Sequence, residues 1–73
     1  MRLNKTEQIV FDAMARLNMW STVKQITAES QKEKQSIQHP SVRRALRTLE
    51  SFKLIRRKDD PEYTSGWRKL YRV

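Results

Sequence analysis

The segment from His39 to Arg57 combines an apolar pattern at helical spacing with a dense set of positive charges. Pro40 suits the first position of a helix, because the N–H group that proline lacks would have no partner there. Apolar residues then recur at steps of three and four, which predicts that one stripe of the helix is buried. We expect Phe52 to close the end of this stripe. The stripe consists of Val42, Ala45, Leu46 and Leu49.

An earlier helix is predicted over residues 5–18. Asn4 is a residue type that caps helix N-termini, and Glu7 follows it at the spacing of a capping box. The apolar residues that come next again recur at helical spacing, so this helix also has one apolar stripe. Phe11 lies off the centre of the stripe and is expected to cover an edge of the core. The stripe consists of Ile9, Val10, Ala13, Met14 and Leu17.

Between these two, a further helix is predicted over residues 22–31. Thr22 and Gln25 repeat the capping-box spacing. The polar residues that follow this helix are expected to form a frayed helix end or a loop, in which Ile37 is the one apolar anchor. The narrow inward face of the helix consists of Val23, Ile26 and Thr27.

The C-terminal part of the chain changes to the alternating period of β-strands. Residues 54–58 and 67–72 have this character, and they flank a polar loop of eight residues that contains the only glycine, Gly66. Two such segments predict an antiparallel hairpin. The expected fold is therefore a single α+β domain over residues 1–73, with three helices followed by a C-terminal hairpin.

The basic residues of the hairpin cannot all share one face, because side chains alternate along a strand. With Ile55 directed inward, we expect Arg57 to point outward and Arg56 and Lys58 to lie on the other side. The strands are better candidates for contact with an anion than the loop, whose acidic residues phosphates would repel. Protection of an edge strand by charge is an equally good explanation of the basic strands. The acidic loop residues are Asp59, Asp60 and Glu62.

Positive charge is concentrated in the middle of the chain. The whole sequence has 16 Lys and Arg residues and 8 Asp and Glu residues, a formal net charge of +8. Residues 35–58 contain seven basic residues and one acidic residue, which gives this segment a net charge of +6. A localised positive field indicates a polyanionic partner, usually nucleic acid and less often an anionic membrane.

The composition of the chain argues against several other kinds of site and function. The chain has no cysteine and one histidine, so disulfides and thiolate metal sites are excluded and no cofactor or metal is expected. No apolar run approaches the roughly 20 residues that span a bilayer, which favours a cytoplasmic protein. Paired carboxylates, a nucleophile with its base and a phosphate-cradling glycine loop do not occur in the sequence, so an enzyme is not expected.

The order "SVRRALRTLE" and then "SFKLIRR" is similar to a known family pattern. Winged-helix domains often have a third helix of the form Ser/Thr-Val-x-x-Ala-Leu-x-x-Leu-Glu, then a Gly-Leu-Ile step into a basic wing strand. Across nearly its whole length, the chain resembles the DNA-binding domains of small winged helix-turn-helix transcription regulators. Lys53 stands where those families usually have glycine. The resemblance implies a winged-helix fold and transcription regulation through double-stranded DNA.

The outward face of the third helix carries the strongest candidates for DNA contact. An arginine fork can bind guanine bidentately or clamp a phosphate, and the N-terminal part of such a helix enters the major groove. A solvated helix face is the alternative interpretation of these charges. The basic hairpin strands are expected on the flanking backbone. The expected DNA-binding residues are Gln38, His39, Ser41, Arg43, Arg44, Arg47, Arg57, Lys58 and Arg68.

Aromatic residues among basic ones raise the alternative of base stacking on single strands. We expect Trp20, Trp67 and Tyr71 to pack in the core instead, because a small chain needs its aromatic residues inside. Trp20 stands where a short strand would pair with the hairpin, and Tyr63 is expected to be exposed.

Two functional alternatives to DNA binding stay open. They are a winged-helix protein-interaction module in a larger assembly and a binder of structured RNA. If the chain binds DNA, it is expected to be a small transcriptional regulator or an accessory factor of phage or plasmid type. A homodimer or a cooperative assembly on DNA is compatible with the sequence.

Overall fold

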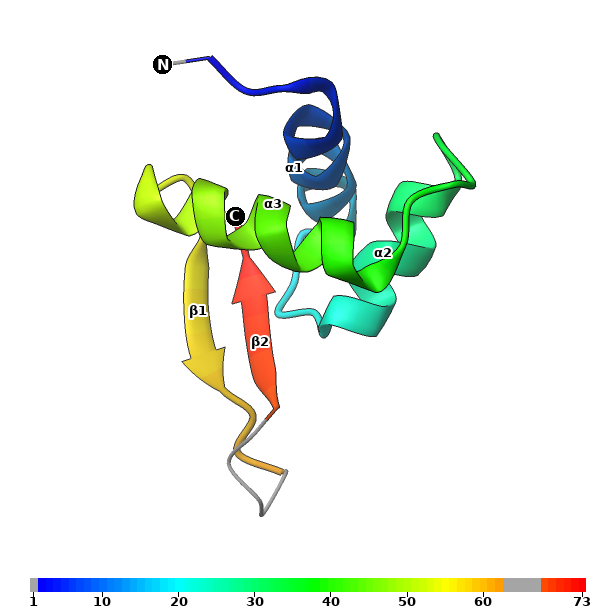
Figure 1. Ribbon diagram of the computed structural model, residues 1–73. Helices are drawn as coiled ribbons and strands as arrows, with labels where there is room; N and C mark the ends of the chain where they lie inside the picture. Colours follow the sequence, from blue (N-terminus) through cyan, green and yellow to red (C-terminus); the bar gives the residue numbers. More distant parts are fainter. Residues whose placement is uncertain (1, 63–67) are drawn as a thin grey trace.

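The computed structural model describes residues 2–62 and 68–73. Three helices are followed by an antiparallel two-stranded sheet (Figure 1), which confirms the expected α+β layout of a winged helix. The expectations for Tyr63, Gly66 and Trp67 lie outside the described residues. The elements are α1 (Lys5–Leu17), α2 (Val23–Gln31), α3 (His39–Ser51), β1 (Arg56–Asp59) and β2 (Lys69–Arg72).

Capping boxes begin the first two helices, as predicted. At α1 the backbone N–H of Glu7 donates to Asn4 Oδ1 (2.8 Å), and the N–H of Asn4 donates to Glu7 Oε1 (2.9 Å). At α2 the N–H of Gln25 donates to Thr22 Oγ1 (3.1 Å), and the N–H of Thr22 donates to Gln25 Oε1 (2.8 Å). Each box satisfies amide groups that a helix start leaves without an intrahelical partner.

The third helix begins one residue earlier than expected, at His39, with Gln38 as its N-cap. Pro40 still lies in the first turn, where its fixed φ angle fits a helix. Phe52 does not close the apolar stripe of this helix, because it is 43% exposed at the C-cap. That expectation was wrong.

The core lies where the apolar stripes of the three helices meet. The stripes of α1 and α3 are buried as predicted, apart from the partly buried Leu17, and Ile26 of α2 joins them. Ile37, in the segment between α2 and α3, is buried as the expected anchor. Phe11 is partly buried against the core, as expected for an edge position. The fully buried large residues are Val10, Met14, Ile26, Val42, Leu46 and Leu49.

A Schellman motif turns the chain from α3 into the hairpin. The N–H of Lys53 donates to the carbonyl of Glu50 (2.9 Å), and the N–H of Leu54 donates to the carbonyl of Leu49 (3.0 Å). Lys53 has a φ of 60°, in the left-handed region that favours glycine. Lysine therefore takes the backbone conformation for which glycine is usually selected, and the tight turn is kept.

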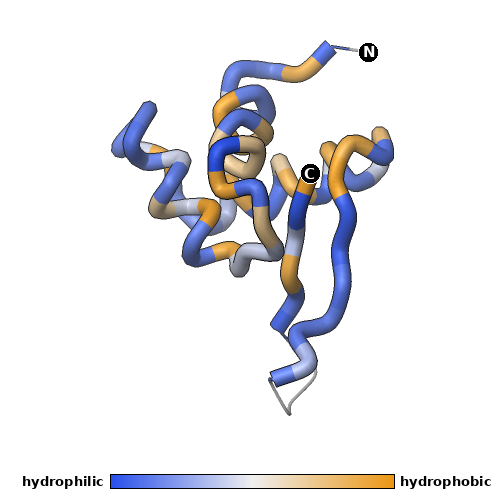
Figure 2. Tube along the Cα trace, turned by 180° about the vertical axis from the view of Figure 1, so that it is seen from behind, coloured by the Kyte–Doolittle hydropathy of each residue, from blue (hydrophilic) through white to orange (hydrophobic). Residues whose placement is uncertain are grey.

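The hairpin projects away from the helices (Figure 1), and β1 is hydrophilic along its length (Figure 2). Within the pairing, Arg57 lies opposite Tyr71, and Lys58 lies opposite Leu70. A bridge continues the sheet on the other side of β2: the N–H groups of Ser21 and Tyr71 each donate to the other's carbonyl (2.9 Å). The pairing that was expected near Trp20 thus occurs one residue later.

Two faces of the hairpin follow from this register, because residues that pair across strands share a face. The front face, which looks toward α3, carries Arg57, Asp59, Lys69 and Tyr71. The back face carries Arg56, Lys58, Leu70 and Arg72.

Arg57 was expected to point outward, and its side chain is exposed, but it lies on the face of the hairpin that looks toward α3. On this front face it meets Glu50 of α3. Arg56 and Lys58 lie on the opposite side from Arg57, as expected.

In the part of the chain that the structure describes, no helix is long and apolar enough to cross a bilayer.

Candidate nucleic-acid interface

Three arginines project from the outer face of α3. Arg43, Arg44 and Arg47 are exposed, while the residues that alternate with them form the buried stripe. The helix is amphipathic because its apolar residues recur at its own period, so the charged residues are directed away from the core. Within residues 2–62 and 68–73, no carboxylate forms an ion pair with any of the three.

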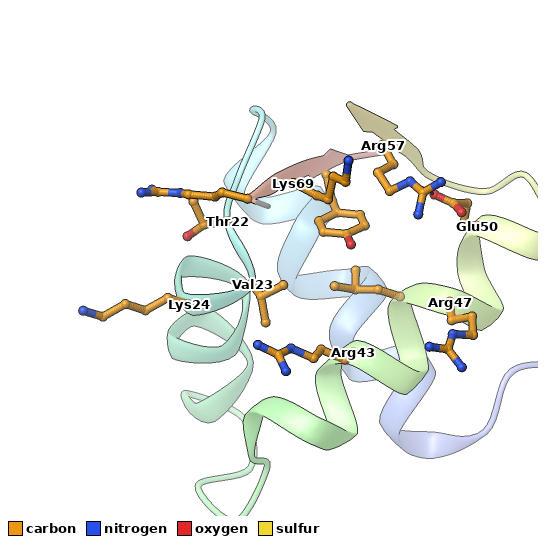
Figure 3. Close-up of a pocket in the computed structure, with 11 residues that line it drawn as sticks. Thr22, Val23, Lys24, Arg43, Arg47, Glu50, Arg57 and Lys69 are labelled. Atoms are coloured by element: carbon orange, nitrogen blue, oxygen red, sulfur yellow. Dashed lines mark ion pairs between the residues drawn. The ribbon is translucent and has the colours of Figure 1, made fainter. Parts of the chain in front are cut away.

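A groove of about 660 Å³ lies between the start of α2, the outer face of α3 and the front of the hairpin. Figure 3 shows Arg43 and Arg47 extending from α3 and Lys24 from α2 at this groove. Glu50 is the one acidic residue in its described lining. The described lining of the groove therefore contains more basic than acidic residues. Its basic residues are Lys24, Arg43, Arg47, Arg57, Arg68 and Lys69.

Besides Lys24, other residues at the start of α2 also line this groove. Thr22, its N-cap, and Val23 also line it, so the positive end of the helix dipole lies at the groove. The apolar part of the lining comes from Val23, Leu46 and Tyr71, and Tyr71 packs against the core as expected. The described lining of the groove thus combines apolar and basic side chains.

The basic residues at the front of the hairpin are paired with acids. Arg57 Nε lies 3.1 Å from Glu50 Oε2, and Arg68 Nε lies 3.2 Å from Asp60 Oδ2. Lys69 is hydrogen-bonded to Asp59, and this bond is the main reason that the pKa of Asp59 is lowered. Much of the positive charge at the front of the hairpin is therefore balanced within the protein.

On the back of the hairpin the basic residues gather around Trp20. Lys58 Nζ lies 4.5 Å from the centre of the indole ring, and the Arg72 guanidinium carbon lies 5.9 Å from it. Both distances are those of cation–π contacts. Trp20 is half-buried and is absent from the hydrophobic cluster, so the expectation that it packs in the core was wrong.

The expected DNA-binding residues fall into three groups. Arg43, Arg47, Arg57 and Arg68 line the groove, and Arg44 lies beside it on α3. Three polar residues at the start of α3 lie outside the groove lining: Gln38 and His39 are exposed, and Ser41 is half-buried. Lys58 is on the back of the hairpin.

Sequence reasoning missed two basic residues of the groove, Lys24 and Lys69. Lys24 follows the predicted N-cap Thr22 by two residues, so the capping signal already placed it in the first turn of α2. Lys69 enters the groove because the hairpin register places it opposite Asp59 on the front face. The strand pattern alone did not give that register.

A network of ion pairs outside the groove joins α1 to the C-terminal end of α2. Arg16 Nε lies 3.0 Å from Glu29 Oε2, and its Nη1 lies 2.8 Å from Glu33 Oε1. These bonds raise the pKa of Arg16, and the bond from Arg16, followed by that from Lys32, lowers the pKa of Glu29. No group of three potential metal-binding side chains occurs among the described residues.

Comparisons with known proteins do not assign the chain to a family. Neither a scan against protein-family models nor a search of curated proteins found a match to the chain.

Proposed function

We propose that this protein binds double-stranded DNA, with α3 in the major groove and the cationic groove on the flanking backbone. The observation that carries the proposal is the set of three exposed arginines on α3 without a carboxylate partner within the described residues. They lie beside a groove with six basic side chains and one acidic one in its described lining. A small transcriptional regulator or an accessory factor of phage or plasmid type fits this architecture.

The dimensions of α3 suit the major groove. Its 13 residues span about 20 Å, and the major groove of B-DNA is about 12 Å wide and admits one helix. Arg43 and Arg47 are one turn apart, and Arg44 is displaced around the helix from both. An arginine fork directed at a base edge binds guanine O6 and N7, and one directed sideways binds a phosphate.

The start of α2 supports contact with the DNA backbone. In a helix-turn-helix the second helix crosses the backbone beside the helix that enters the groove. Lys24 and the positive end of α2 both lie at the groove, next to Arg43 of α3. Phosphates are attracted to such a helix terminus by the dipole and by the basic side chain together.

Salt dependence of duplex binding tests the proposal. If five to seven phosphates are neutralised, log K falls with log salt concentration at a slope of about −4.5 to −6. We expect the double variant Arg44→Glu, Arg47→Glu to weaken binding at least about tenfold and to reduce the slope, because two phosphate or base contacts become repulsive. Fluorescence anisotropy with a labelled duplex measures both quantities.

A matched control is available in Lys5→Glu, Lys34→Glu. It changes the net charge by the same amount, but both lysines are exposed and line a different surface hollow, with Asp12 and Glu33. We expect its affinity to fall much less than that of the α3 variant. Equal losses in the two variants, or a slope near zero for the wild type, would refute the proposal. Competition by duplex RNA at equal strength would assign the surface to RNA instead.

A further inference from the structure

The back face of the hairpin gathers positive charge without balancing it. Arg56 and Arg72 are directly opposite each other in the register, and Lys58 is two residues along on the same face. None of the three has an ion pair with a carboxylate of the described residues. The front face of the same two strands is different, because its basic residues are paired with Glu50 and Asp59.

This arrangement works against the stability of the hairpin. Like charges directly opposite each other on paired strands are destabilising. Arg56 and Arg72 form such a pair, and Lys58 adds a third positive charge nearby. Protection of an edge strand by charge does not require like charges to face one another across the strands. An external anion that binds all three removes the repulsion.

Trp20 contacts two of these three charges, Lys58 and Arg72. Its indole ring lies under Lys58 at 4.5 Å and near Arg72 at 5.9 Å. The next residue, Ser21, is held to Tyr71 by two backbone hydrogen bonds of 2.9 Å, so the backbone that carries the indole is tied to the hairpin. Because Lys58 lies over the ring, the face of Trp20 beneath it is a platform for the ammonium group rather than for a nucleic-acid base.

The chemistry of this surface suits the phosphates of a duplex. Arg56 and Lys58 are two residues apart on one strand, which is about 7 Å and comparable with the separation of successive phosphates along a DNA strand. Among the described residues, this surface consists of positive charges on two paired strands, and Lys58 lies over the ring of Trp20. Such a surface binds backbone and carries no sequence information.

We propose that the back face of the hairpin is a second DNA-binding surface, which holds the phosphate backbone of a second duplex segment. Arg56, Lys58 and Arg72 bind the phosphates, and Trp20 positions Lys58. The back face is directed away from α3, because the front face of the same ribbon looks toward it. One molecule can therefore join two duplex segments. This bridging rests on the proposed function of α3, whereas the back-face contact itself does not.

A two-duplex retention assay tests bridging. Protein is bound to an immobilised duplex at low salt, and retention of a second, fluorescent duplex is measured. The test variant is Arg56→Gln, Lys58→Gln, Arg72→Gln, which removes three charges while keeping polar side chains. We expect it to bind the first duplex within about threefold of the wild type and to retain at least about tenfold less of the second. Thermal unfolding checks that the variant is folded.

The variant Arg43→Gln, Arg44→Gln, Arg47→Gln separates this proposal from the proposed function. It removes the same number of charges from α3. If the back face binds DNA, this variant keeps weak duplex binding with a salt slope of about −2.7, the value for three phosphates. Removal of all six charges abolishes that binding. Residual binding by the α3 variant is measurable whether or not α3 itself binds DNA.

Other results would overturn the proposal. Normal bridging by the back-face variant would show that molecules bridge by self-association, which sedimentation without DNA would reveal. An equal loss of first-duplex affinity in the two triple variants would place the back face in the same interface as α3. Binding to phosphatidylserine vesicles that depends on the back-face charges, without retention of a second duplex, would assign the surface to a membrane.

Discussion

Arg57 of β1 and Glu50 of α3 form an ion pair in which Nε lies 3.1 Å from Oε2. The pair joins the hairpin to the helix that we propose enters the major groove (Figure 3). Because the two side chains are 51% and 35% exposed, the pair is expected to contribute no more than about 1 kcal/mol to stability. Its larger effect is on the groove, where Glu50 neutralises one of the cations that line it.

Replacement of Glu50 by glutamine is expected to strengthen duplex binding. The change removes the acidic residue from the described groove lining and leaves Arg57 able to bind a phosphate. The salt slope should become steeper by about 0.9, the value for one additional phosphate contact. The free energy of unfolding should change by less than about 1 kcal/mol. Anisotropy titrations at several salt concentrations and urea unfolding measure the two effects.

Glu33→Gln is the matched control for this prediction. It makes the same change of charge and also breaks an ion pair with an arginine, but that pair joins Arg16 to the end of α2, outside the groove. Its salt slope should equal that of the wild type. Weaker binding by Glu50→Gln would show instead that the ion pair holds the hairpin in the position that DNA requires.

Lys53→Gly is expected to stabilise the protein by about 1 kcal/mol. Lys53 has a φ of 60°, and a non-glycine residue in this region costs about 1–2 kcal/mol. Part of the gain is lost because glycine has more freedom in the unfolded chain. Urea unfolding measures the difference. Lys53→Ala is the control: it removes the charge but keeps the Cβ atom, so it should give no comparable gain. Equal stabilisation by both would assign the effect to charge.

Local determinants explain why the helices were predictable. The Asn4–Glu7 and Thr22–Gln25 boxes each act within four residues, so the sequence contains everything that fixes those helix starts. Spacing of apolar residues determines the buried stripe for the same reason. The left-handed turn at Lys53 did not follow from the sequence, because lysine stands where the winged-helix pattern usually has glycine, and two hydrogen bonds hold the turn in spite of the side chain.

Contacts between distant residues explain what the sequence did not reveal. The pairing of Arg57 with Glu50 depends on the hairpin register and on where the hairpin lies against α3. A shift of one residue would exchange the two faces of a strand, and the sequence alone does not exclude it. Trp20 likewise has its neighbours Lys58 and Arg72 only because Ser21 pairs with Tyr71.

Leu49→Ala is expected to remove much of the stability of this small domain. Leu49 is fully buried, and truncation of a buried leucine costs about 2–5 kcal/mol. A chain of 73 residues has a free energy of unfolding of about 4–11 kcal/mol at ordinary values per residue. The variant should therefore unfold at much lower urea concentration. Phe52→Ala, at the exposed C-cap of the same helix, should change stability far less; equal losses would contradict the burial pattern.

Stability is expected to fall in acid through Glu29. Its pKa is lowered in the folded protein by hydrogen bonds from Arg16 and then from Lys32. A carboxyl group whose folded pKa lies below its unfolded value stabilises the protein fully above the unfolded value, which is about 4.3 for glutamate. That contribution is lost as the pH falls through the lower, folded pKa. Asp59, whose pKa is lowered mainly by its bond from Lys69, acts in the same direction.

Urea unfolding of the wild type and of Glu29→Gln between pH 6 and pH 2 tests this linkage. Above about pH 5 the wild type should be the more stable of the two, because only its carboxylate forms ion pairs with Arg16 and Lys32. The difference should shrink steadily below that pH as the carboxylate of the wild type becomes protonated. Arg16 stays charged throughout, because its pKa is raised. A difference that is constant with pH would mean that Glu29 stabilises the fold by packing and not by its charge.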